Sequence, residues 1–254
     1  MIKTTRVNKI KDFVFEKKSV SLDELVKMFN VSKNTIRRDI QILVDGGEIK
    51  KVYGGVAVNH SKLESFHERK IRNQKEKEWI AKKAAQFVED GDIIFIDSGT
   101  TTIEMIELLK MKTLSIITNS LELIIRALPF ENLNVISLGG ILERQTNSFG
   151  SVQNIDLLKA YNINKAFMAS TGISLTNGVT NASPLESKLK QSIVEKSKEV
   201  FLLVDHDKFN KQSLITYCPL EDINCIITDA VPEKEYQDFA KENNIHIVIT
   251  NHSS

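Results

Sequence analysis

Residues 20–43 read VSLDELVKMFNVSKNTIRRDIQIL and contain two consecutive helical patterns. The first pattern begins at Ser21, and Glu24 stands three positions later, which is the spacing of a capping box. The connection at Asn30-Val31 is short, and Ser32 then provides a second N-cap. In both patterns apolar residues recur every three or four positions, as on the buried face of a helix. Two short helices joined by a tight turn predict a helix-turn-helix unit.

The exposed face of the second helix distinguishes this unit from an ordinary helical hairpin. The N-terminal end of a recognition helix enters the major groove of DNA. Arginine pairs with guanine there, asparagine pairs with adenine, and serine or threonine binds phosphate. The helix offers side chains of these types at Ser32, Lys33, Asn34, Thr35, Arg37 and Arg38. The alternative is a solvated polar face without a partner.

A small wing is predicted after the second helix, which is expected to end at Gly46-Gly47. The sequence that follows at 48–58, EIKKVYGGVAV, has two short apolar-rich runs on either side of a Gly-Gly turn. Lys50, Lys51 and Tyr53 lie near this turn, where we expect them to contact the DNA backbone; the alternative for the lysines is a plain surface position. With one amphipathic helix before the pair, residues 1–58 are predicted to form a winged helix-turn-helix domain.

The distribution of charge agrees with a DNA-binding N-terminus. The whole chain has a net charge of +1, but residues 1–60 contain 12 Lys and Arg against 7 Asp and Glu, a net of +5. The remainder contains 22 against 26, a net of −4. A basic segment on a mildly acidic body indicates that the segment meets a polyanion, although a basic solvated surface would have the same composition.

Composition restricts the remaining classes of protein. The 254 residues are 41% hydrophobic and 26% charged, which is typical of a globular protein with a small and a larger domain. No apolar run reaches the roughly 18 to 20 residues of a membrane span, and no secretory signal is found. The two cysteines, Cys218 and Cys225, form no CxxC pair, so we expect neither disulfides nor zinc and a cytoplasmic location.

The rest of the chain predicts an α/β domain. Residues 59–75 are polar and read as a connector that becomes partly helical, and helical periodicity returns at Glu76. Over residues 76–254, short apolar strands alternate with helices, which predicts a mostly parallel sheet covered by helices. The expected strands begin with Ile93–Ile96 and end with Ile245–Ile249. Ligands of such sheets bind at the carboxyl ends of the strands.

Small polar residues follow four of the predicted strands. The longest run is Asp97-Ser98-Gly99-Thr100-Thr101-Thr102, between a buried strand and a helix, where N–H groups and hydroxyls surround an anion. It lacks the Gly-Lys-Ser/Thr ending of a P-loop, and a capped strand-to-helix turn is the alternative. Similar groups recur at Thr118-Asn119-Ser120, Gly139-Gly140 and Ser170-Thr171-Gly172. Each alone is also a capped turn, but together they predict a pocket for phosphate and hydroxyl groups.

Charged residues near these strand ends complete the candidate site. Glu186 and Lys190 are four positions apart on one predicted helix. They either form a surface ion pair or line the pocket. Asp205 and Lys208 follow another strand, and His206 between them is expected to be an ordinary loop histidine. No metal-ligand pattern, catalytic triad or acid/base pair follows from the spacing. We therefore expect no catalytic residue, no metal and no cofactor.

The N-terminal motifs resemble the DNA-binding domain of the DeoR family of bacterial regulators. The specific run is Ser32-x-x-Thr35-Ile36-Arg37-Arg38-Asp39. It is supported by Arg6, Ile10, Val20-Ser21-Leu22, Phe29-Asn30-Val31 and Ile40. One departure is Tyr53-Gly54-Gly55, where the family usually has His-Gly-Gly. Tyrosine still donates to phosphate, so the departure does not conflict with DNA binding.

The C-terminal part is similar to the sensor domain of the same family, which resembles sugar-phosphate isomerases and CoA transferases. The matching positions are Asp97, Gly99-Thr100-Thr101, Thr118-Asn119-Ser120, Gly139-Gly140, Gly172, Glu186, Lys190, Asp205 and Lys208-Phe209. The resemblance covers nearly the whole chain. It implies a phosphorylated effector and a homo-oligomer.

Three stretches are similar to the branch of the family that represses inositol-utilisation operons in Gram-positive bacteria. They are VSKNT at 31–35, KVYGGV at 51–56 and YNINKAFM at 161–168. Family members with other effectors share much of this sequence. The resemblance implies a repressor of a carbohydrate operon, that of myo-inositol, and 2-deoxy-5-keto-D-gluconate 6-phosphate as effector, with other phosphosugars as the alternative.

Two classes of function remain open at this level. The first is a repressor whose small domain binds operator DNA and whose large domain senses a metabolite. The second is a sugar-phosphate isomerase-like enzyme with a DNA-binding appendage, which an acid/base pair in the large domain would favour. The sequence favours the repressor because it shows no such pair. Whether the regulator represses or activates at a given promoter does not follow from the residues.

Overall fold

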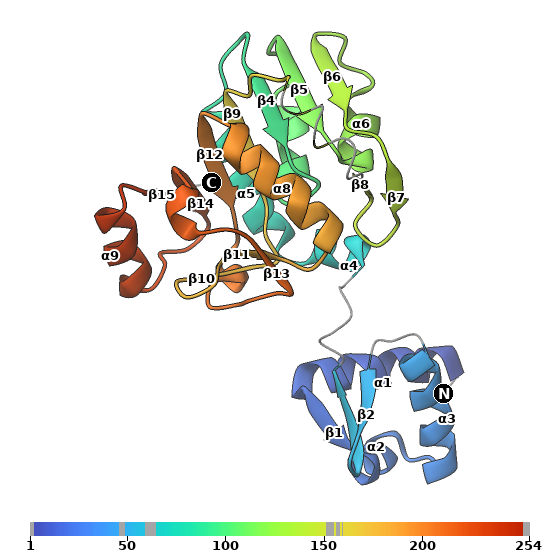
Figure 1. Ribbon diagram of the computed structural model, residues 1–254. Helices are drawn as coiled ribbons and strands as arrows, with labels where there is room; N and C mark the ends of the chain where they lie inside the picture. The colour runs from blue at the N-terminus through green and yellow to red at the C-terminus, as the bar shows by residue number, and fades with distance from the viewer. Residues whose placement is uncertain are drawn as a thin grey trace. The chain divides into compact units, whose positions relative to one another are not determined.

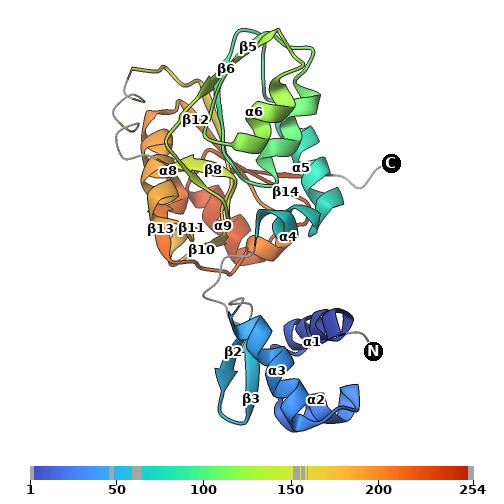
Figure 2. The same cartoon turned by 90° about the vertical axis from the view of Figure 1, so that its right-hand side faces the viewer.

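The computed structural model describes residues 3–45, 49–58, 65–150, 155, 158 and 160–250. The chain divides into two compact units, Met1–Leu63 and Glu64–Ser254, which are called the small unit and the large unit below. Figures 1 and 2 show the elements of each unit from two directions. The predicted helix end at Gly46-Gly47 lies outside the described residues.

The small unit has the predicted winged helix-turn-helix order. Its elements are α1 (Lys3–Lys17), β1 (Ser19–Ser21), α2 (Leu22–Phe29), α3 (Lys33–Asp45), β2 (Ile49–Val52) and β3 (Gly55–Val58). The Ser21 hydroxyl accepts a hydrogen bond from the Glu24 N–H at 3.1 Å, and α2 ends at Asn30 in the left-handed region with φ 48°. Both features agree with the capping and turn signals in the sequence.

Strand β1 is a third strand of the wing that the sequence did not reveal. It pairs with β3, so the antiparallel sheet has the order β1-β3-β2. Three residues are too few to show a period-two pattern, and β1 depends on its partner strand. Gly55 is needed at this contact, because a Cβ atom there would lie 2.2 Å from the carbonyl oxygen of Val20.

An ion pair joins the first helix of the small unit to the third. Arg6 Nε donates to Asp39 Oδ2 at 2.6 Å, and Arg6 Nη2 donates to Asp39 Oδ1 at 3.3 Å. Asp39 is buried beside the apolar side chains of Ile36 and Ile40, which face the core of this unit. The two-pronged contact fixes α3 on α1 and leaves the opposite face of α3 to solvent.

The large unit is the predicted α/β domain. Its first elements are α4 (Phe66–Ile71), α5 (Gln74–Ala85), β4 (Ile93–Ile96), η1 (Thr102–Leu108), β5 (Leu114–Thr118), α6 (Leu121–Ala127), β6 (Leu133–Ser137), β7 (Ile141–Glu143) and β8 (Ser148–Gly150). There follow β9 (Lys165–Met168), β10 (Gly172–Ser174), β11 (Gly178–Asn181), α8 (Pro184–Lys196), β12 (Glu199–Leu203), η2 (His206–Lys208), β13 (Ile215–Cys218), η3 (Leu220–Asp222), β14 (Cys225–Thr228), α9 (Lys234–Glu242) and β15 (His246–Ile249).

A seven-stranded parallel sheet forms the centre of the large unit (Figure 1). Its order is β15-β14-β12-β9-β4-β5-β6, and every pair is parallel. Alternate strand residues pack with α8 and α9 on one face and with α5, η1 and α6 on the other. After β4 the chain builds β5 and β6 on one side and β9 on the other. The sheet therefore has a topological switch point between β4 and β9, where such folds bind ligands.

Several local predictions differ from the structure. The helix expected after the Gly-Thr run is the 3₁₀ helix η1. The connector predicted at 59–75 is partly helical, as expected, and its helical residues form α4 and the start of α5 in the large unit. The hairpin β7–β8 and the antiparallel sheet β10-β11-β13 were not predicted. Their strands have three or four residues, which is too short for periodicity to separate them from loops. Cys218 and Cys225 are both buried and free.

Candidate functional site

The predicted DNA-contacting residues lie on the solvent side of α3. Lys33, Asn34, Arg37 and Arg38 are exposed, whereas Ile36 is buried. The two arginines thus project away from the core, as the helical period requires. The face left to solvent is the one that carries the basic and amide groups.

Two of the α3 residues have a local structural role. The Ser32 hydroxyl accepts a hydrogen bond from the Thr35 N–H at 3.2 Å, and the two hydroxyls lie 2.9 Å apart. Ser32 is therefore the N-cap that the sequence predicted. Lys33 Nζ lies 2.7 Å from Asp23 Oδ1, and both side chains are largely exposed. The hydrogen bond from Lys33 lowers the pKa of Asp23.

The wing presents further groups of the predicted kind. Tyr53 is fully exposed beside Gly54, whose φ of 77° makes the tight turn possible. Lys50 is exposed, and Lys51 Nζ donates to Gln41 Oε1 at 2.6 Å, which ties the wing to α3. The small unit thus has an exposed surface of basic, amide and hydroxyl groups on α3 and the wing.

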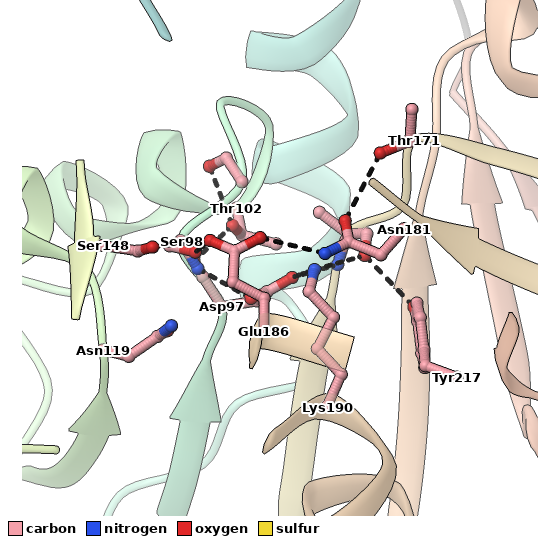
Figure 3. Close-up of polar contacts among 12 residues, drawn as sticks. Asp97, Ser98, Thr102, Asn119, Ser148, Thr171, Asn181, Glu186, Lys190 and Tyr217 are labelled. Atoms are coloured by element: carbon pink, nitrogen blue, oxygen red, sulfur yellow. Dashed lines mark hydrogen bonds and ion pairs between the residues drawn. The ribbon is translucent and has the colours of Figure 1, made fainter. Parts of the chain in front are cut away.

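A buried polar cluster lies at the switch point of the large unit (Figure 3). Asp97, at the end of β4, accepts hydrogen bonds from the N–H groups of Ser98 and Ala169, both at 2.9 Å. Lys190 Nζ, on α8, lies 2.5 Å from Asp97 Oδ2 and donates to the Ala169 carbonyl oxygen at 2.9 Å. This ion pair joins the neighbouring strands β4 and β9 to α8.

Glu186 is the second buried carboxylate of the cluster and lies one helical turn before Lys190. Its Oε1 accepts from Ser148 Oγ at 2.5 Å and from Ser98 Oγ at 3.4 Å. Its Oε2 accepts from Asn181 Nδ2 at 2.9 Å. Burial by itself raises the pKa of Glu186, but the Lys190 charge and the donors Ser148 and Asn181 lower it below its usual value. Glu186 is therefore ionised at neutral pH.

Residues 97–101 form the buried loop between β4 and η1, and Thr102 is the first residue of η1. Thr102 Oγ1 donates to the carbonyl oxygens of Asp97 at 2.6 Å and Gly99 at 2.9 Å, which fixes the loop conformation. Thr100 and Thr101 are also buried. Gly99 has no room for a side chain, because a Cβ atom there would lie 2.2 Å from Ala169 Cβ. A loop of this kind presents N–H groups and hydroxyls to a small anion.

Two buried oxygen atoms at the neighbouring strand ends have no hydrogen-bond partner within the described residues. They are Asn119 Oδ1, after β5, and Ser170 Oγ, after β9. Asn119 Nδ2 is already engaged with the Phe149 carbonyl oxygen at 3.4 Å. An orphaned buried polar group is unfavourable, and Thr228 Oγ1 at the end of β14 and Thr250 Oγ1 after β15 share this property.

Not every predicted site residue joins this cluster. Gly139 and Gly140 are exposed and lead into β7. Ser120 Oγ caps α6 by accepting from the Leu123 N–H at 3.2 Å. Asp205, although buried, accepts from the Asp207 N–H at 3.1 Å and has no contact with Asp97 among those that the structure shows.

The remaining predicted residues occupy the edge of the cluster or lie beyond it. Thr171 Oγ1 donates to Asn181 Oδ1 at 3.3 Å. Gly172 begins β10, and a Cβ atom there would lie 2.5 Å from the Lys211 carbonyl oxygen. Lys208 is half-buried in η2, after β12.

The tertiary structure brings three further residues to the cluster that no sequence pattern indicated. Ser148 is on β8 and Asn181 is on β11. Tyr217, on β13, donates to the Ala169 carbonyl oxygen at 3.1 Å, and its ring lies 5.4 Å from Lys190 Nζ. Each is on a short strand that had not been predicted. Only the NAS run before Pro184 offered a sequence signal, since asparagine and serine precede a helix there.

The described part of the chain was compared with the patterns of a metal site and of a membrane span. Its residues contain no group of three or more His, Cys, Asp and Glu side chains that would hold a metal ion. None of its helices combines the length and the apolar character needed to cross a bilayer.

Two family models match the chain. Residues 6–62 match the DeoR-like helix-turn-helix domain, and residues 72–230 match the DeoR C terminal sensor domain. Together the two matches cover both the exposed basic surface and the whole of the buried cluster.

Similar proteins are known along the full length. The HTH-type transcriptional regulator IolR of Bacillus subtilis (strain 168) is 45% identical over 248 residues, which are 97% of this chain and 99% of that protein. The glycerol-3-phosphate regulon repressor of Escherichia coli (strain K12) is 30% identical over 249 residues, 97% of this chain and 99% of that protein. Ribose 5-phosphate isomerase A from Methanocaldococcus jannaschii has a TM-score of 0.41 and 20% identity, covering 54% of this chain and 55% of that chain.

Proposed function

The chain belongs to the DeoR family of DNA-binding transcriptional regulators, and we propose that it represses a carbohydrate catabolic operon, that of myo-inositol, until a phosphorylated sugar-like metabolite releases it. The small unit would bind operator DNA through α3 and the wing. The large unit would bind the metabolite at the buried cluster. Since DNA is the target, we place its action in the cytoplasm.

The effector proposal rests mainly on the buried cluster at the switch point. Its polar groups are already oriented by one another, so a ligand meets a preformed site. Glu186 and the orphaned Asn119 Oδ1 are acceptors for hydroxyl groups. The loop at Gly99-Thr100-Thr101 is the candidate place for the phosphate.

The inositol operon is proposed from similarity rather than from geometry. It is supported by the 45% identity to IolR and by the resemblance of residues 31–35, 51–56 and 161–168 to inositol-operon repressors. The corresponding effector would be 2-deoxy-5-keto-D-gluconate 6-phosphate. The enzyme alternative is not favoured, because relatives that match along the whole chain are named as regulators or repressors.

A gel shift on the upstream DNA of an inositol operon and of the chain's own gene tests this function. We expect a retarded complex that 2-deoxy-5-keto-D-gluconate 6-phosphate dissolves, with fructose 6-phosphate and glycerol 3-phosphate as comparison compounds. No complex on either DNA would refute the operon assignment. Release by one of the comparison compounds alone would reassign the effector.

The phosphate location needs a substitution that the loop tolerates. Gly99→Ala is unsuitable because its methyl group would collide with Ala169. Thr100→Val preserves the shape of the side chain and removes its hydroxyl. We expect this variant to fold and to bind operator DNA but to need a higher effector concentration for release. Release at the parent's concentration would place the phosphate elsewhere.

We also propose that the repressor acts as a homo-oligomer. One winged unit of about 55 residues covers too little DNA for tight specific binding, and two copies would read half-sites about one helical turn, or a multiple, apart. Light scattering and footprinting test this together. A monomer that binds tightly to a single half-site would contradict it.

A further inference from the structure

The buried cluster at the switch point contains two carboxylates and one ammonium group. Asp97, Glu186 and Lys190 are all less than 5% exposed. Lys190 Nζ lies 2.5 Å from Asp97 Oδ2, so these two charges form a pair. Glu186 forms no ion pair within the described residues, although the charge of Lys190 contributes to lowering its pKa. Glu186 is therefore the unbalanced charge of the cluster.

Lys190 is already engaged by the protein on several sides (Figure 3). An ammonium group has three N–H donors. Lys190 Nζ donates to Asp97 Oδ2 and to the Ala169 carbonyl oxygen, the latter at 2.9 Å, and the centre of the Tyr217 ring lies 5.4 Å away. The Tyr217 hydroxyl donates to the same carbonyl oxygen at 3.1 Å. An anionic group of a ligand would have to displace one of these contacts to reach Lys190.

The surroundings of Glu186 stabilise its charged form. Ser148 Oγ and Asn181 Nδ2 donate to its two carboxylate oxygens, and Asn181 Oδ1 accepts from Thr171 Oγ1 at 3.3 Å. Glu186 also lies in the first turn of α8, where its N–H donates to Ser183 Oγ at 3.3 Å. A helix N-terminus favours a negative side chain. Glu186 thus presents a fixed negative charge to a ligand in the cluster.

The two sides of the cluster differ in the hydrogen bonds that they offer. The loop at 97–101 presents N–H groups and hydroxyls, which suit an anion. Glu186 presents an acceptor: a carboxylate accepts about four hydrogen bonds, and its Oε2 receives only the one from Asn181 Nδ2 within the part of the chain described. Ser98 Oγ, 3.4 Å from Glu186 Oε1, joins the two sides. A group close to a phosphate on the loop therefore comes next to Glu186.

We propose that Glu186 determines the orientation of the metabolite: hydroxyl groups bind against Glu186, and a carboxylate is kept away from it. A hydroxyl donates to the carboxylate oxygen, whereas a second carboxylate has no donor and is repelled. In 2-deoxy-5-keto-D-gluconate 6-phosphate, hydroxyl groups lie between a phosphate at one end and a carboxylate at the other. With the phosphate on the loop, the hydroxyl groups lie against Glu186 and the carboxylate points away. This inference rests on the proposed effector site and makes Glu186 a specificity-determining residue.

The sign of one substitution decides between the two orientations. Glu186→Gln preserves the size of the side chain and removes its charge. We expect its affinity for 2-deoxy-5-keto-D-gluconate 6-phosphate, measured by calorimetry, to fall about five- to tenfold, because a neutral acceptor forms a weaker hydrogen bond than a charged one. Unchanged or tighter binding would overturn the proposal, since a carboxylate that faces this residue gains from loss of the charge.

The matched control is Glu195→Gln. It removes the same charge from an exposed position in the C-terminal half of α8, far along the helix from the cluster. We expect this variant to bind the probe as the parent does. An equal loss of affinity in both variants would mean that net charge, rather than contact with Glu186, sets the affinity, and the proposal would be wrong.

A second test compares two small probes on the parent protein. Glycerol 3-phosphate and 3-phosphoglycerate differ only in a hydroxyl group that is a carboxylate in the second compound. Thermal unfolding is followed at the single tryptophan, Trp79 on α5. At equal concentration, glycerol 3-phosphate should raise the unfolding temperature more than 3-phosphoglycerate does, and the difference should shrink or reverse in Glu186→Gln. Equal stabilisation of the parent by both compounds would contradict the proposal.

The outcomes separate this inference from the function beneath it. If the parent binds none of the three compounds, the proposed effector site is wrong, and the role of Glu186 is wrong with it. If the parent binds 2-deoxy-5-keto-D-gluconate 6-phosphate and Glu186→Gln binds it equally well, only the orientation is wrong. Where Glu186→Gln fails to fold, the comparison of the two small probes on the parent provides the decision, because it needs no substitution.

Discussion

The small unit exposes its candidate functional side chains, whereas the large unit buries them. Arg37, Arg38 and Tyr53 are open to solvent, whereas Asp97, Glu186 and Lys190 are all less than 5% exposed. An exposed basic group is solvated before it meets DNA and costs the fold little. A buried charge is tolerated only with partners, so each charged group of the cluster also supports the structure around it. The same kind of substitution should therefore have different consequences in the two units.

The largest effect should follow from breaking the buried pair. Asp97→Ala leaves Lys190 buried without its carboxylate, and we expect the large unit to lose about 3–5 kcal/mol of stability. Denaturant unfolding monitored at Trp79 reports on this unit, because α5 packs against the sheet. Asp238→Ala, at an exposed position on α9, is the control and should leave the midpoint unchanged. Equal unfolding midpoints for Asp97→Ala and Asp238→Ala would contradict the expected difference between buried and exposed charges.

A smaller effect, on binding rather than folding, is expected in the small unit. Arg37→Ala and Arg38→Ala each remove a candidate base or phosphate contact, and loss of a good base contact costs about 1–3 kcal/mol of operator affinity. Stability should not change, since both side chains point to solvent. Fluorescence anisotropy with labelled operator measures the affinity, with Lys9→Ala on α1 as control. If both arginine variants bind like the control, α3 is not the recognition helix.

The smallest effect should come from the exposed pair between Lys33 and Asp23. Their contact of 2.7 Å is solvated on both sides, so Asp23→Ala should leave the unfolding midpoint of the chain unchanged. It also removes a negative charge next to Lys33, which should slightly raise affinity for DNA at low salt. The gain should vanish as salt screens the charges. A gain that persists at high salt would mean that Asp23 acts other than through its charge.

The helices and the wing of the small unit could be predicted from the sequence because their signals are local. Capping residues, apolar spacing and the exposed basic face involve residues within a few turns of one another, and α2, α3 and the wing follow as predicted. The Arg6–Asp39 pair spans 33 positions and did not follow from any local pattern. Strand β1 was missed for the same reason, because β3, the strand with which it pairs, lies far along the chain.

In the large unit the sequence determined the order of strands and helices, because buried parallel strands are continuous apolar runs and the polar residues that end them are conspicuous. That Asp97 and the loop after it lie at the strand end where the buried cluster forms was therefore predictable. The partners that turn this loop into a cluster come from far along the chain: Lys190 is 93 positions from Asp97, and Ser148 is 38 positions from Glu186. Only the tertiary structure decided these pairings. Which groups meet a buried charge depends on which strands and helices lie beside it, and the order of strands in a sheet is not set by local sequence.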